Sequence, residues 1–423
     1  MIEDFLHYIW LYKKFDVLHI TTTQQEPLDI LSAGYHNLNS GPDFFNGLLR
    51  IGEQVWAGNI EIHIRSSDWY HHNHEMDAAY DNVILHVVYD HDTDIFRKDN
   101  SVIPTLELKN YICKDLLVAY YRLFSKHEQW INCDYGIAEV PEFALKHWLE
   151  RLYFERLEQK SNTIDVFLIT TKQDWEAVLF RLLAKNFGLK VNSEAFLSMA
   201  QSFEFSIVRK VQSDSQLLEA LLLGQSGVLE KEKINPYYKK LQKDYRFLKQ
   251  KFQLNNQGVE TSRFFRLRPP NFPTIRLSQL ANLYYKEPNL FSKVILIEEL
   301  SEFYELFKVS ASMFWKTHYS FDKESKASHK YLTTPFIDLL LINTILPLKF
   351  YYAKQKGDVN HENLIKIISA IHSEKNSIIK GFDRLGVYSD SAMHSQALIQ
   401  LKTNYCDKNK CLKCVIGNTL LNK

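Results

Sequence analysis

The chain contains 423 residues with a formal net charge of +1, and 45% of them are hydrophobic. This length exceeds one ordinary hydrophobic core, and the composition excludes a disordered protein. The charge is uneven, because residues 1–110 carry 17 acidic and 7 basic side chains and 9 of the 16 histidines. The first part therefore suits cation binding, and the basic remainder suits a polyanionic partner.

The sequence predicts neither export nor membrane insertion. The N-terminus, MIEDFLHYIW, is acidic and lacks both a basic flank and a small-residue cleavage site. The most apolar window, residues 336–348, is interrupted by Asp338, Asn343 and Pro347 and is too short to cross a bilayer. We therefore expect a cytoplasmic protein with no membrane partner. In that compartment the five cysteines predict reduced thiols or metal ligands rather than disulfides.

The first 110 residues predict a compact α/β unit. Helical apolar spacing covers residues 3–14, and strand or irregular structure is expected in 18–31. A helix capped by Ser66, Ser67 and Asp68 is expected to continue to Tyr80. The expected strands are residues 44–51 and 55–65, joined as a hairpin, then 83–89 and 103–108.

From about residue 115 the pattern becomes helical, and one proline-rich stretch, residues 263–276, excludes a helix interior. We expect an α/β domain over residues 1–115, with a mixed sheet flanked by helices. A mainly α-helical region over residues 116–423 would follow and end in a cysteine cluster. The expected helices include residues 114–125, 141–159, 171–187, 194–201, 213–223 and 235–252, with several more after 278.

Two carboxylates and a histidine gather at one end of the predicted hairpin. Apolar and polar residues alternate over 60–65, so Glu61 and His63 point to the same face of their strand. Gly41 and Pro42 leave Asp43 at the start of the preceding strand, where pairing brings it close to Glu61. Carboxylate oxygens suit Mg²⁺ or Mn²⁺, which can polarise a phosphoryl group and supply a hydroxide nucleophile. The alternative is a solvated hairpin face without chemistry.

Pro42-Asp43, Glu61-Ile62-His63, the helix beginning near Asp68 and the buried strand 83–89 resemble the PD-(D/E)xK nuclease superfamily. The resemblance implies a restriction-endonuclease-like fold in which Asp43 and Glu61 bind Mg²⁺. His63 would stand where the superfamily usually has lysine. Because histidine is only partly cationic near neutral pH, both an active enzyme and a non-catalytic descendant stay open.

The whole chain resembles a bacterial family classed as a domain of unknown function, family 2851. The resemblance implies no established activity. The stretches that carry it are GPDFFNGLLRI, GNIEIHIRSSDWYHHNHEMDAAYDNVILHVV, RPPNFPTIRLSQLA and YCDKNKCLKCVIG.

Further histidines follow the hairpin and offer a second kind of metal site. On a helix His71, His74 and Asp77 would share one face, an arrangement that could bind Zn²⁺. His86, in the neighbouring strand, is expected to face the site, whereas His72 is expected to be a surface residue. A zinc hydrolase built from these imidazoles is the alternative to a magnesium enzyme.

Three cysteines near the C-terminus have the spacing C-x4-C-x2-C, and three thiols so close predict a metal site. A fourth ligand would complete a Zn²⁺ site or an iron–sulfur cluster. Cys133 is the best remote candidate, ahead of Cys113 and His394. The alternative is a reduced surface loop. The clustered cysteines are Cys406, Cys411 and Cys414.

The cysteine arrangement is also similar to that of exonucleases of recombination and CRISPR systems. In those enzymes one distant and three clustered C-terminal cysteines staple a PD-(D/E)xK fold. The similarity implies that the cluster of this chain is structural and ties the last helix back onto the body of the protein.

Two basic stretches, residues 231–251 and 263–276, contain aromatic side chains and predict contacts with nucleic acid. Lysine and arginine neutralise phosphates, while aromatic rings stack on unpaired bases. A solvated helix face is the ordinary explanation of the first stretch. The residues expected to bind the backbone of DNA or RNA are Lys239, Lys243, Arg263, Arg266, Arg268 and Arg276.

These features together predict a metal-dependent, nuclease-like protein that hydrolyses or binds a nucleic-acid phosphodiester backbone. Asp43, Glu61, His63 and His86 would form its catalytic site. A non-catalytic nucleic-acid-binding or scaffold protein with a vestigial site is the alternative, and a zinc hydrolase is the second alternative.

Overall fold

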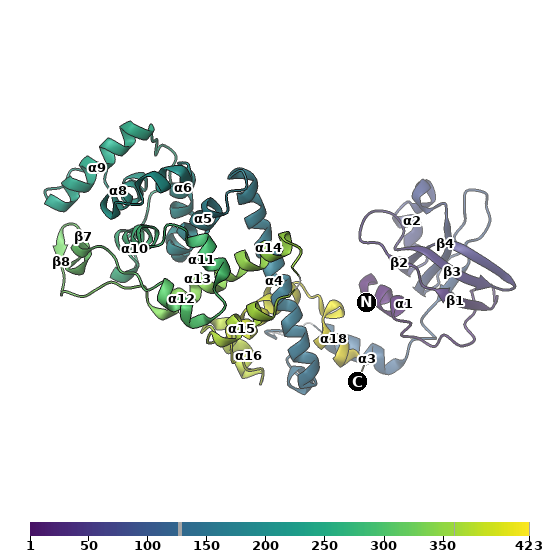
Figure 1. The fold of residues 1–423 in the computed structure, drawn as a ribbon. Coiled ribbons are helices and arrows are strands. Elements are labelled where there is room, and N and C mark those ends of the chain that lie inside the picture. Colours follow the sequence, from purple (N-terminus) through teal and green to yellow (C-terminus); the bar gives the residue numbers. More distant parts are fainter. Residues whose placement is uncertain (126–128, 359, 423) are drawn as a thin grey trace. The chain divides into compact units, whose positions relative to one another are not determined.

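The computed structural model describes residues 1–125, 129–358 and 360–422, which divide into two compact units (Figure 1). Unit 1 comprises residues 1–148, 385–387 and 402–423, and unit 2 comprises residues 149–384 and 388–401. The chain therefore leaves unit 1, forms unit 2 and returns to unit 1.

Unit 1 is built on a mixed β-sheet, as the sequence predicts. Three strands are antiparallel, in the order β1–β3–β4, and β5 and β6 continue the sheet parallel to β4. The short β2 pairs with β3 beside β1. The bounds are β1 (Leu28–Ser32), β2 (Tyr35–His36), β3 (Phe44–Ile51), β4 (Gln54–Arg65), β5 (Val83–Asp90) and β6 (Thr105–Glu107).

The predicted hairpin is confirmed as β3–β4, which turns between Ile51 and Gln54. β4 runs on beyond the hairpin and pairs with β5, so it lies in the interior of the sheet. Residues 60–63 are consequently all buried, including the polar Glu61 and His63. A strand covered on both faces needs partners for its polar side chains within the protein.

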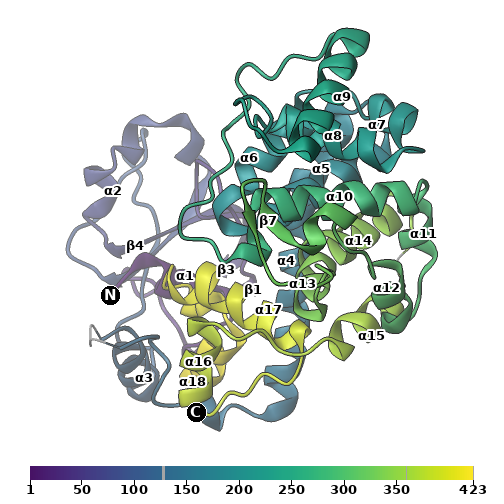
Figure 2. The same ribbon diagram turned by 90° about the vertical axis from the view of Figure 1, so that its left-hand side faces the viewer.

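Helices pack against this sheet. α1 (Glu3–Leu11) contacts β4 and buries Phe5, Ile9 and Trp10. α2 (Asp68–His71) also contacts β4, and its Trp69 joins an apolar cluster with β5. α3 (Lys114–Phe124) contacts the C-terminal α18 (Val415–Leu421), and the two helices lie side by side in both ribbon views (Figure 1 and Figure 2).

The helix expected from Asp68 to Tyr80 is much shorter than predicted. α2 ends at His71, because Asn73 takes a left-handed conformation with φ of 59°. Asp77 then starts a separate 3-10 turn, in which its carboxylate accepts a hydrogen bond from the Ala79 N–H at 2.9 Å. His71, His74 and Asp77 therefore do not share a helix face.

Unit 2 is mainly helical. Along the chain, the strands of the large sheet end with β6, and helices predominate from α3 onward. Unit 2 contains one small sheet of two strands, β7 (His318–Ser320) and β8 (Lys323–Glu324). α4 (Glu142–Thr170) begins in unit 1 and continues into unit 2. The other helices are α5 (Trp175–Phe187), α6 (Leu189–Gln201), α7 (Phe205–Val211), α8 (Ser215–Gln225), α9 (Pro236–Phe252), α10 (Pro273–Lys286), α11 (Leu290–Leu296), α12 (Leu300–Leu306), α13 (Thr334–Leu340), α14 (Leu346–Gln355), α15 (Glu362–Ala370), α16 (Ser377–Arg384) and α17 (Ala392–Leu401).

The apolar window of the sequence lies in one continuous helical stretch of 22 residues, Thr334–Gln355, in which a π-helical turn joins α13 to α14. This helix is longer than the sequence predicts and long enough to cross a membrane. However, 67% of its most apolar window is buried within the protein. A core helix of a globular unit has this character.

Candidate metal centre

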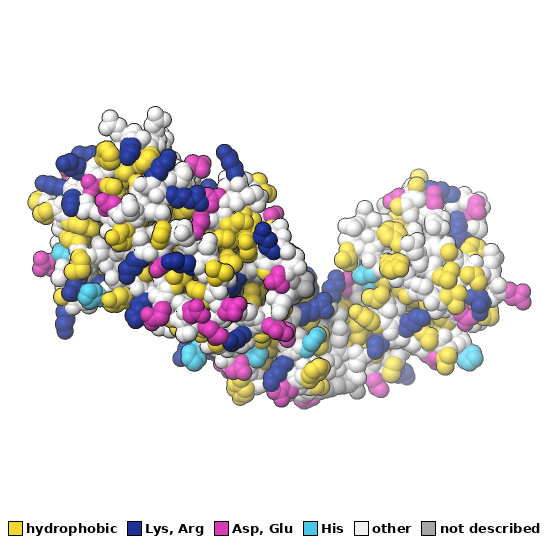
Figure 3. Space-filling model, in the orientation of Figure 1, with side chains coloured by type: hydrophobic (Ala, Val, Ile, Leu, Met, Phe, Trp, Pro, Cys, Tyr) yellow, Lys and Arg dark blue, Asp and Glu magenta, His cyan; other side chains and the backbone are white. Residues whose placement is uncertain are grey.

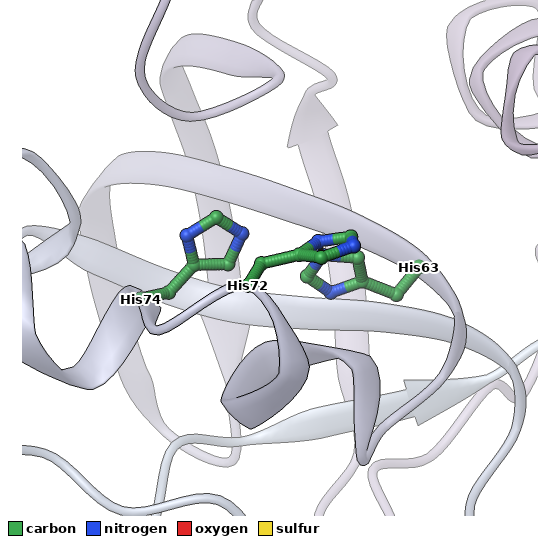
Figure 4. Close-up of side chains that lie close together, drawn as sticks. All are labelled: His63, His72 and His74. Atoms are coloured by element: carbon green, nitrogen blue, oxygen red, sulfur yellow. Dashed lines mark hydrogen bonds between the residues drawn. The ribbon is translucent and has the colours of Figure 1, made fainter.

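Three histidines converge on one face of the sheet in unit 1. His63 comes from β4, whereas His72 and His74 come from the segment after α2, and Figure 4 shows their imidazole rings gathered together. One ring nitrogen from each histidine lies within 4.8 Å of those of the other two. We refer to His63, His72 and His74 as the histidine cluster.

Glu61 adds a carboxylate to the histidine cluster. Its Oε1 lies 3.5 Å from Nε2 of His63 and 3.4 Å from Nε2 of His74. Glu61 and His63 share a face of β4 because they are two residues apart. Burial raises the pKa of Glu61 to about 7, although His74 opposes that rise. A cation at this place would favour the charged carboxylate.

Some of the separations in this group are typical of a metal ligand shell. Ligand atoms that surround Zn²⁺ tetrahedrally at their usual bond length are separated from one another by roughly 3.3 Å. Nε2 of His63 lies 3.1 Å from Nδ1 of His72, which is close to that separation, as are the two distances to Glu61. The three imidazoles of the histidine cluster therefore have the composition and grouping of a transition-metal site, with Glu61 beside His63 and His74.

The imidazole of His63 contacts that of His86. Nδ1 of His63 lies 2.8 Å from Nε2 of His86, which is fully buried in β5. When His63 donates its Nδ1 proton to His86, its Nε2 presents a lone pair to the histidine cluster. Such a contact fixes the ring and tautomer of a metal ligand. His86 thus contacts the histidine cluster through its member His63.

Burial and the two neighbouring imidazoles lower the pKa of His63 to about 3. The ring is therefore neutral at physiological pH. The expected role of His63 as a partly cationic counterpart of lysine is wrong for these surroundings, because a charged imidazole would be desolvated beside His72 and His74. A neutral imidazole suits a metal ligand.

Asp43 lies beside this centre, at the start of β3, as the sequence predicts. Its backbone N–H donates to Oε2 of Glu61 at 3.1 Å, and its own Oδ2 accepts from the Ile62 N–H at 3.0 Å. Nε2 of His7, from α1, lies 3.1 Å from the same Oδ2. Burial alone would lower the pKa of His7, but Asp43 and nearby acids more than offset that effect and raise it.

Aromatic rings and a cavity border the centre. Tyr80 stacks on His74 with 3.8 Å between ring centroids, and Trp69 packs edge-on against His74. A cavity of about 230 Å³ opens beside these three side chains, and Arg97 and Lys98 contribute to its lining. Glu75, Asp81 and Asp99 line it as well, and Lys98 pairs with Asp81 at 2.7 Å, so the space beside the centre carries charges of both signs.

A family model described as "Protein of unknown function (DUF2851)" matches residues 3–377 of the sequence. The chain belongs to the DUF2851 family. No curated protein and no solved structure matches it. The resemblance to this family is thereby confirmed across most of the chain, and it assigns no chemistry to the residues described above.

The DUF2851 chain also brings its distant cysteine to the C-terminal cluster. Burial raises the pKa of Cys133, and each of the other three thiols raises it further. The same mutual effect links Cys406 to Cys411 and Cys414, and Cys411 to Cys414. Nδ2 of Asn132, next to Cys133, lies 3.6 Å from Sγ of Cys411, and Cys113, the fifth cysteine, is exposed.

Five of the six cationic residues predicted to bind nucleic acid are exposed on unit 2 of the DUF2851 chain. Lys239 and Lys243 lie on α9, over which Lys and Arg side chains are prominent in Figure 3. The other three precede α10 and lie near a cavity of about 350 Å³ whose lining includes Lys231, Lys233 and Phe264. These three are Arg263, Arg266 and Arg268.

Arg276 does not belong to this surface, and the expectation that it binds phosphate is wrong. α10 begins at Pro273, so Arg276 lies in its first turn and is buried. Its guanidinium stacks 3.6 Å from the ring centroid of Phe336 and donates to Gln279 and Asn271. Burial lowers its pKa to about 10.

Two residues of the centre have roles that differ from the sequence-based interpretation. His72 belongs to the histidine cluster although it is exposed, as the sequence predicts, whereas the side chain of His71 is 72% exposed and lies against Asp68. Asn73, between His72 and His74, is the sequence signal for the end of this helix, because asparagine tolerates the left-handed conformation that ends a helix. His7 carries no sequence signal, since its contact with Asp43 depends on how α1 packs.

Proposed function

We propose that this protein is a metal-dependent hydrolase that cleaves phosphodiester bonds in nucleic acid. The observation that carries the proposal is the histidine cluster, whose three ring nitrogens lie within 4.8 Å of one another, with Oε1 of Glu61 at 3.5 Å from His63 and 3.4 Å from His74. A surface coincidence would not require a buried glutamate, a buried histidine and a second histidine behind it.

The ligand set favours Zn²⁺ or Mn²⁺ over Mg²⁺. Imidazole nitrogen suits zinc and other transition metals, whereas Mg²⁺ selects oxygen ligands and retains water. The sequence-based pair of Asp43 and Glu61 would hold Mg²⁺ with two carboxylates alone. In the present proposal the three imidazoles are the ligands, Glu61 lies beside His63 and His74, and Asp43 serves a different purpose.

A bound ion would polarise a phosphoryl oxygen and lower the pKa of a water molecule. Asp43, whose Oδ2 is held by Ile62 and His7, would accept the proton of the attacking water on its other oxygen. The water oxygen bonds to phosphorus as the bond to the leaving sugar oxygen breaks, and solvent supplies the proton of that oxygen.

The resemblance to PD-(D/E)xK nucleases supports this reading of unit 1. An acid begins β3, a second acid lies in β4, and the buried β5 pairs parallel to β4. A restriction-endonuclease-like fold is therefore part of the proposal.

Nucleic acid is the proposed substrate because exposed cationic residues accompany exposed aromatic rings on unit 2. Phe247 on α9 is 54% exposed, and Phe265 beside Arg266 is 78% exposed. Lysine and arginine would neutralise phosphates while such rings stack on unpaired bases. Tyr238 and Tyr245 of α9 do not contribute, since both are buried, and Tyr237 stacks on Phe314 with 4.3 Å between ring centroids.

The test uses the full chain, freed of metal and then supplied with Zn²⁺, Mn²⁺ or Mg²⁺. Linear duplex DNA, single-stranded DNA and RNA serve as substrates. We expect cleavage with Zn²⁺ or Mn²⁺ and a loss of at least about 100-fold in the variant His72→Ala/His74→Ala, which lacks two ligands. His71→Ala is the matched control, because it removes a neighbouring exposed histidine outside the cluster, and it should keep full activity.

Equal cleavage by the double variant and the wild type would contradict the proposal. Metal binding with tight nucleic-acid binding but no cleavage would instead favour the non-catalytic binding or scaffold protein. Metal-dependent hydrolysis of simple phosphate esters without any effect on nucleic acid would favour a zinc hydrolase of another substrate class.

A further inference from the structure

The cavity of about 230 Å³ beside the candidate metal centre has aromatic walls. Trp69 and Tyr80 line it and pack on His74, and Phe96 lines it with 43% of its surface exposed. Sites for drug-sized ligands usually measure roughly 300–1,000 Å³, so this smaller cavity suits a single flat ring system. Such ring systems stack on aromatic side chains.

The charged groups around the cavity do not suit a phosphate. Nζ of Lys98 lies 2.7 Å from Oδ1 of Asp81. The guanidinium of Arg97 donates to the carbonyl oxygens of Val83 and Val102, each at 3.1 Å. Because three acids share the lining with these two cations, a phosphate would meet an excess of negative charge, whereas a neutral ligand with N–H donors would be attracted. The three acids are Glu75, Asp81 and Asp99.

Two residues of the lining carry a buried polar atom that has no hydrogen-bond partner within the part of the chain that the structure describes. These atoms are Nε1 of Trp69, which is a donor, and Oε2 of Glu75, which is an acceptor. Trp69 as a whole is only 2% exposed. Because buried polar groups normally have partners, the two atoms fit a ligand that accepts from an indole and donates to a carboxylate.

His74 links the cavity to the candidate metal centre. It lines the cavity, and its Nε2 lies 3.4 Å from Oε1 of Glu61. A nucleotide whose phosphate lies at the histidine cluster would therefore have this cavity beside it for its base.

We propose that the cavity binds an unpaired nucleobase that carries an exocyclic amino group, which means adenine, cytosine or guanine. The amino group would donate to Glu75, while a ring nitrogen or keto oxygen of the base would accept from Trp69. Uracil and thymine lack this amino group and would bring a carbonyl oxygen against the carboxylate. Pairing in a duplex occupies the same edge of the base, so single strands are the preferred substrate. This assignment rests on the proposed function, since it takes the substrate to be nucleic acid.

The first test titrates cytidine and uridine into the metal-free full chain and follows binding by NMR. The two nucleosides have the same size and no phosphate, and they differ at the edge of the base that would face Glu75. We expect cytidine to bind at least about tenfold more tightly than uridine, because a hydrogen bond to a charged group contributes that much. Glu75→Leu should abolish this preference. Glu53→Leu, which makes the same change at an exposed position in the β3–β4 turn, is the matched control and should keep the preference.

The second test needs no variant of the cavity, because it follows the indole N–H signal of Trp69 in the wild type. Cytidine should shift this signal downfield as a hydrogen bond forms, whereas ribose should leave it unchanged. Equal affinity for cytidine and uridine, a preference that survives in Glu75→Leu, or an unmoved Trp69 signal would overturn the assignment, even in a chain that cleaves nucleic acid. A preference for cytidine in a chain that cleaves no nucleic acid would support the assignment and contradict the proposed hydrolase.

Discussion

Buried ionisable side chains show how strongly single residues of this protein depend on their surroundings. Glu61 lies among imidazoles, and its raised pKa reflects burial. Glu176 of α5 in unit 2 has a raised pKa of about 7 for the same reason, although it accepts a hydrogen bond from the Phe291 N–H at 2.9 Å. Its second oxygen, Oε2, is buried and has no hydrogen-bond partner.

Glu176 therefore makes stability depend on pH. Its folded pKa lies above the unfolded value of 4.5, so between these two values the folded state binds more protons than the unfolded state. Stability is consequently lost as the pH rises through this window. We expect Glu176→Gln to gain about 2 kcal/mol relative to wild type between pH 4.5 and 8, a figure reduced for the partial exposure of the side chain.

The measurement is chemical denaturation of both proteins at a series of pH values. The comparison uses the change with pH of the difference in free energy of unfolding between the two proteins. Any effect of the substitution that is the same at every pH therefore cancels. A difference in free energy of unfolding that stays flat from pH 4.5 to 8 would contradict the prediction.

At the scale of elements, the sequence predicts strands and hairpins well where periodicity and turn residues agree. β3, β4 and β5 lie where alternating or continuous apolar patterns indicate them, and Asp43 and Glu61 meet as expected. Cys133 as a fourth ligand stays a prediction, and the contact that the structure gives there joins its neighbour Asn132 to Cys411. For the strands, a short pattern contains most of the information.

The remaining features depend on where elements begin and end, which a single sequence indicates less clearly. His72 joins the histidine cluster in place of His71, because the helix ends after His71 rather than at Tyr80. Arg276 is buried because α10 begins at Pro273, where proline is favoured in the first helical turn. A shift of one turn changes which side chains reach solvent.

The packing of α8 on α9 provides a test at this scale. A Cβ at Gly224 would lie 2.1 Å from the ring of Tyr245, which is held by a hydrogen bond from its hydroxyl to Gln225 at 2.7 Å. Although alanine favours helix formation, we expect the clash to dominate and Gly224→Ala to lower the free energy of unfolding by about 1–3 kcal/mol.

Denaturation of the full chain measures this change. Ser215→Ala, at the start of α8, is the control, because it alters the same helix without approaching α9, and it should change stability by less than about 0.5 kcal/mol. Wild-type stability in Gly224→Ala would show that α9 packs on α8 differently.

At the scale of the whole molecule, unit 1 is discontinuous in sequence. Residues 402–423 belong to it, and α18 buries Ile416, Leu420 and Leu421. Deleting this segment should therefore destabilise unit 1 by roughly 5 kcal/mol, since each of these side chains contributes about 1.5–3 kcal/mol when buried.

Hydrogen exchange of the truncated chain measures this effect. Amides of β4 and β5 should exchange much faster than in the full chain, whereas amides of the unit 2 helices should keep their protection. Equal loss of protection in both units would contradict the division of the chain. Unchanged protection in β4 and β5 would show that the segment is dispensable.

The bond between the side chains of Asn132 and Asn409 joins residues that are 277 positions apart. During synthesis the first residue therefore leaves the ribosome long before its partner exists, and domains tend to fold as they emerge. Unit 1 therefore lacks its C-terminal segment while the helical unit is translated and folds. The sheet of a newly made chain would thus need protection until residues 402–423 are translated. The packing of this segment onto unit 1 is then the last step of folding.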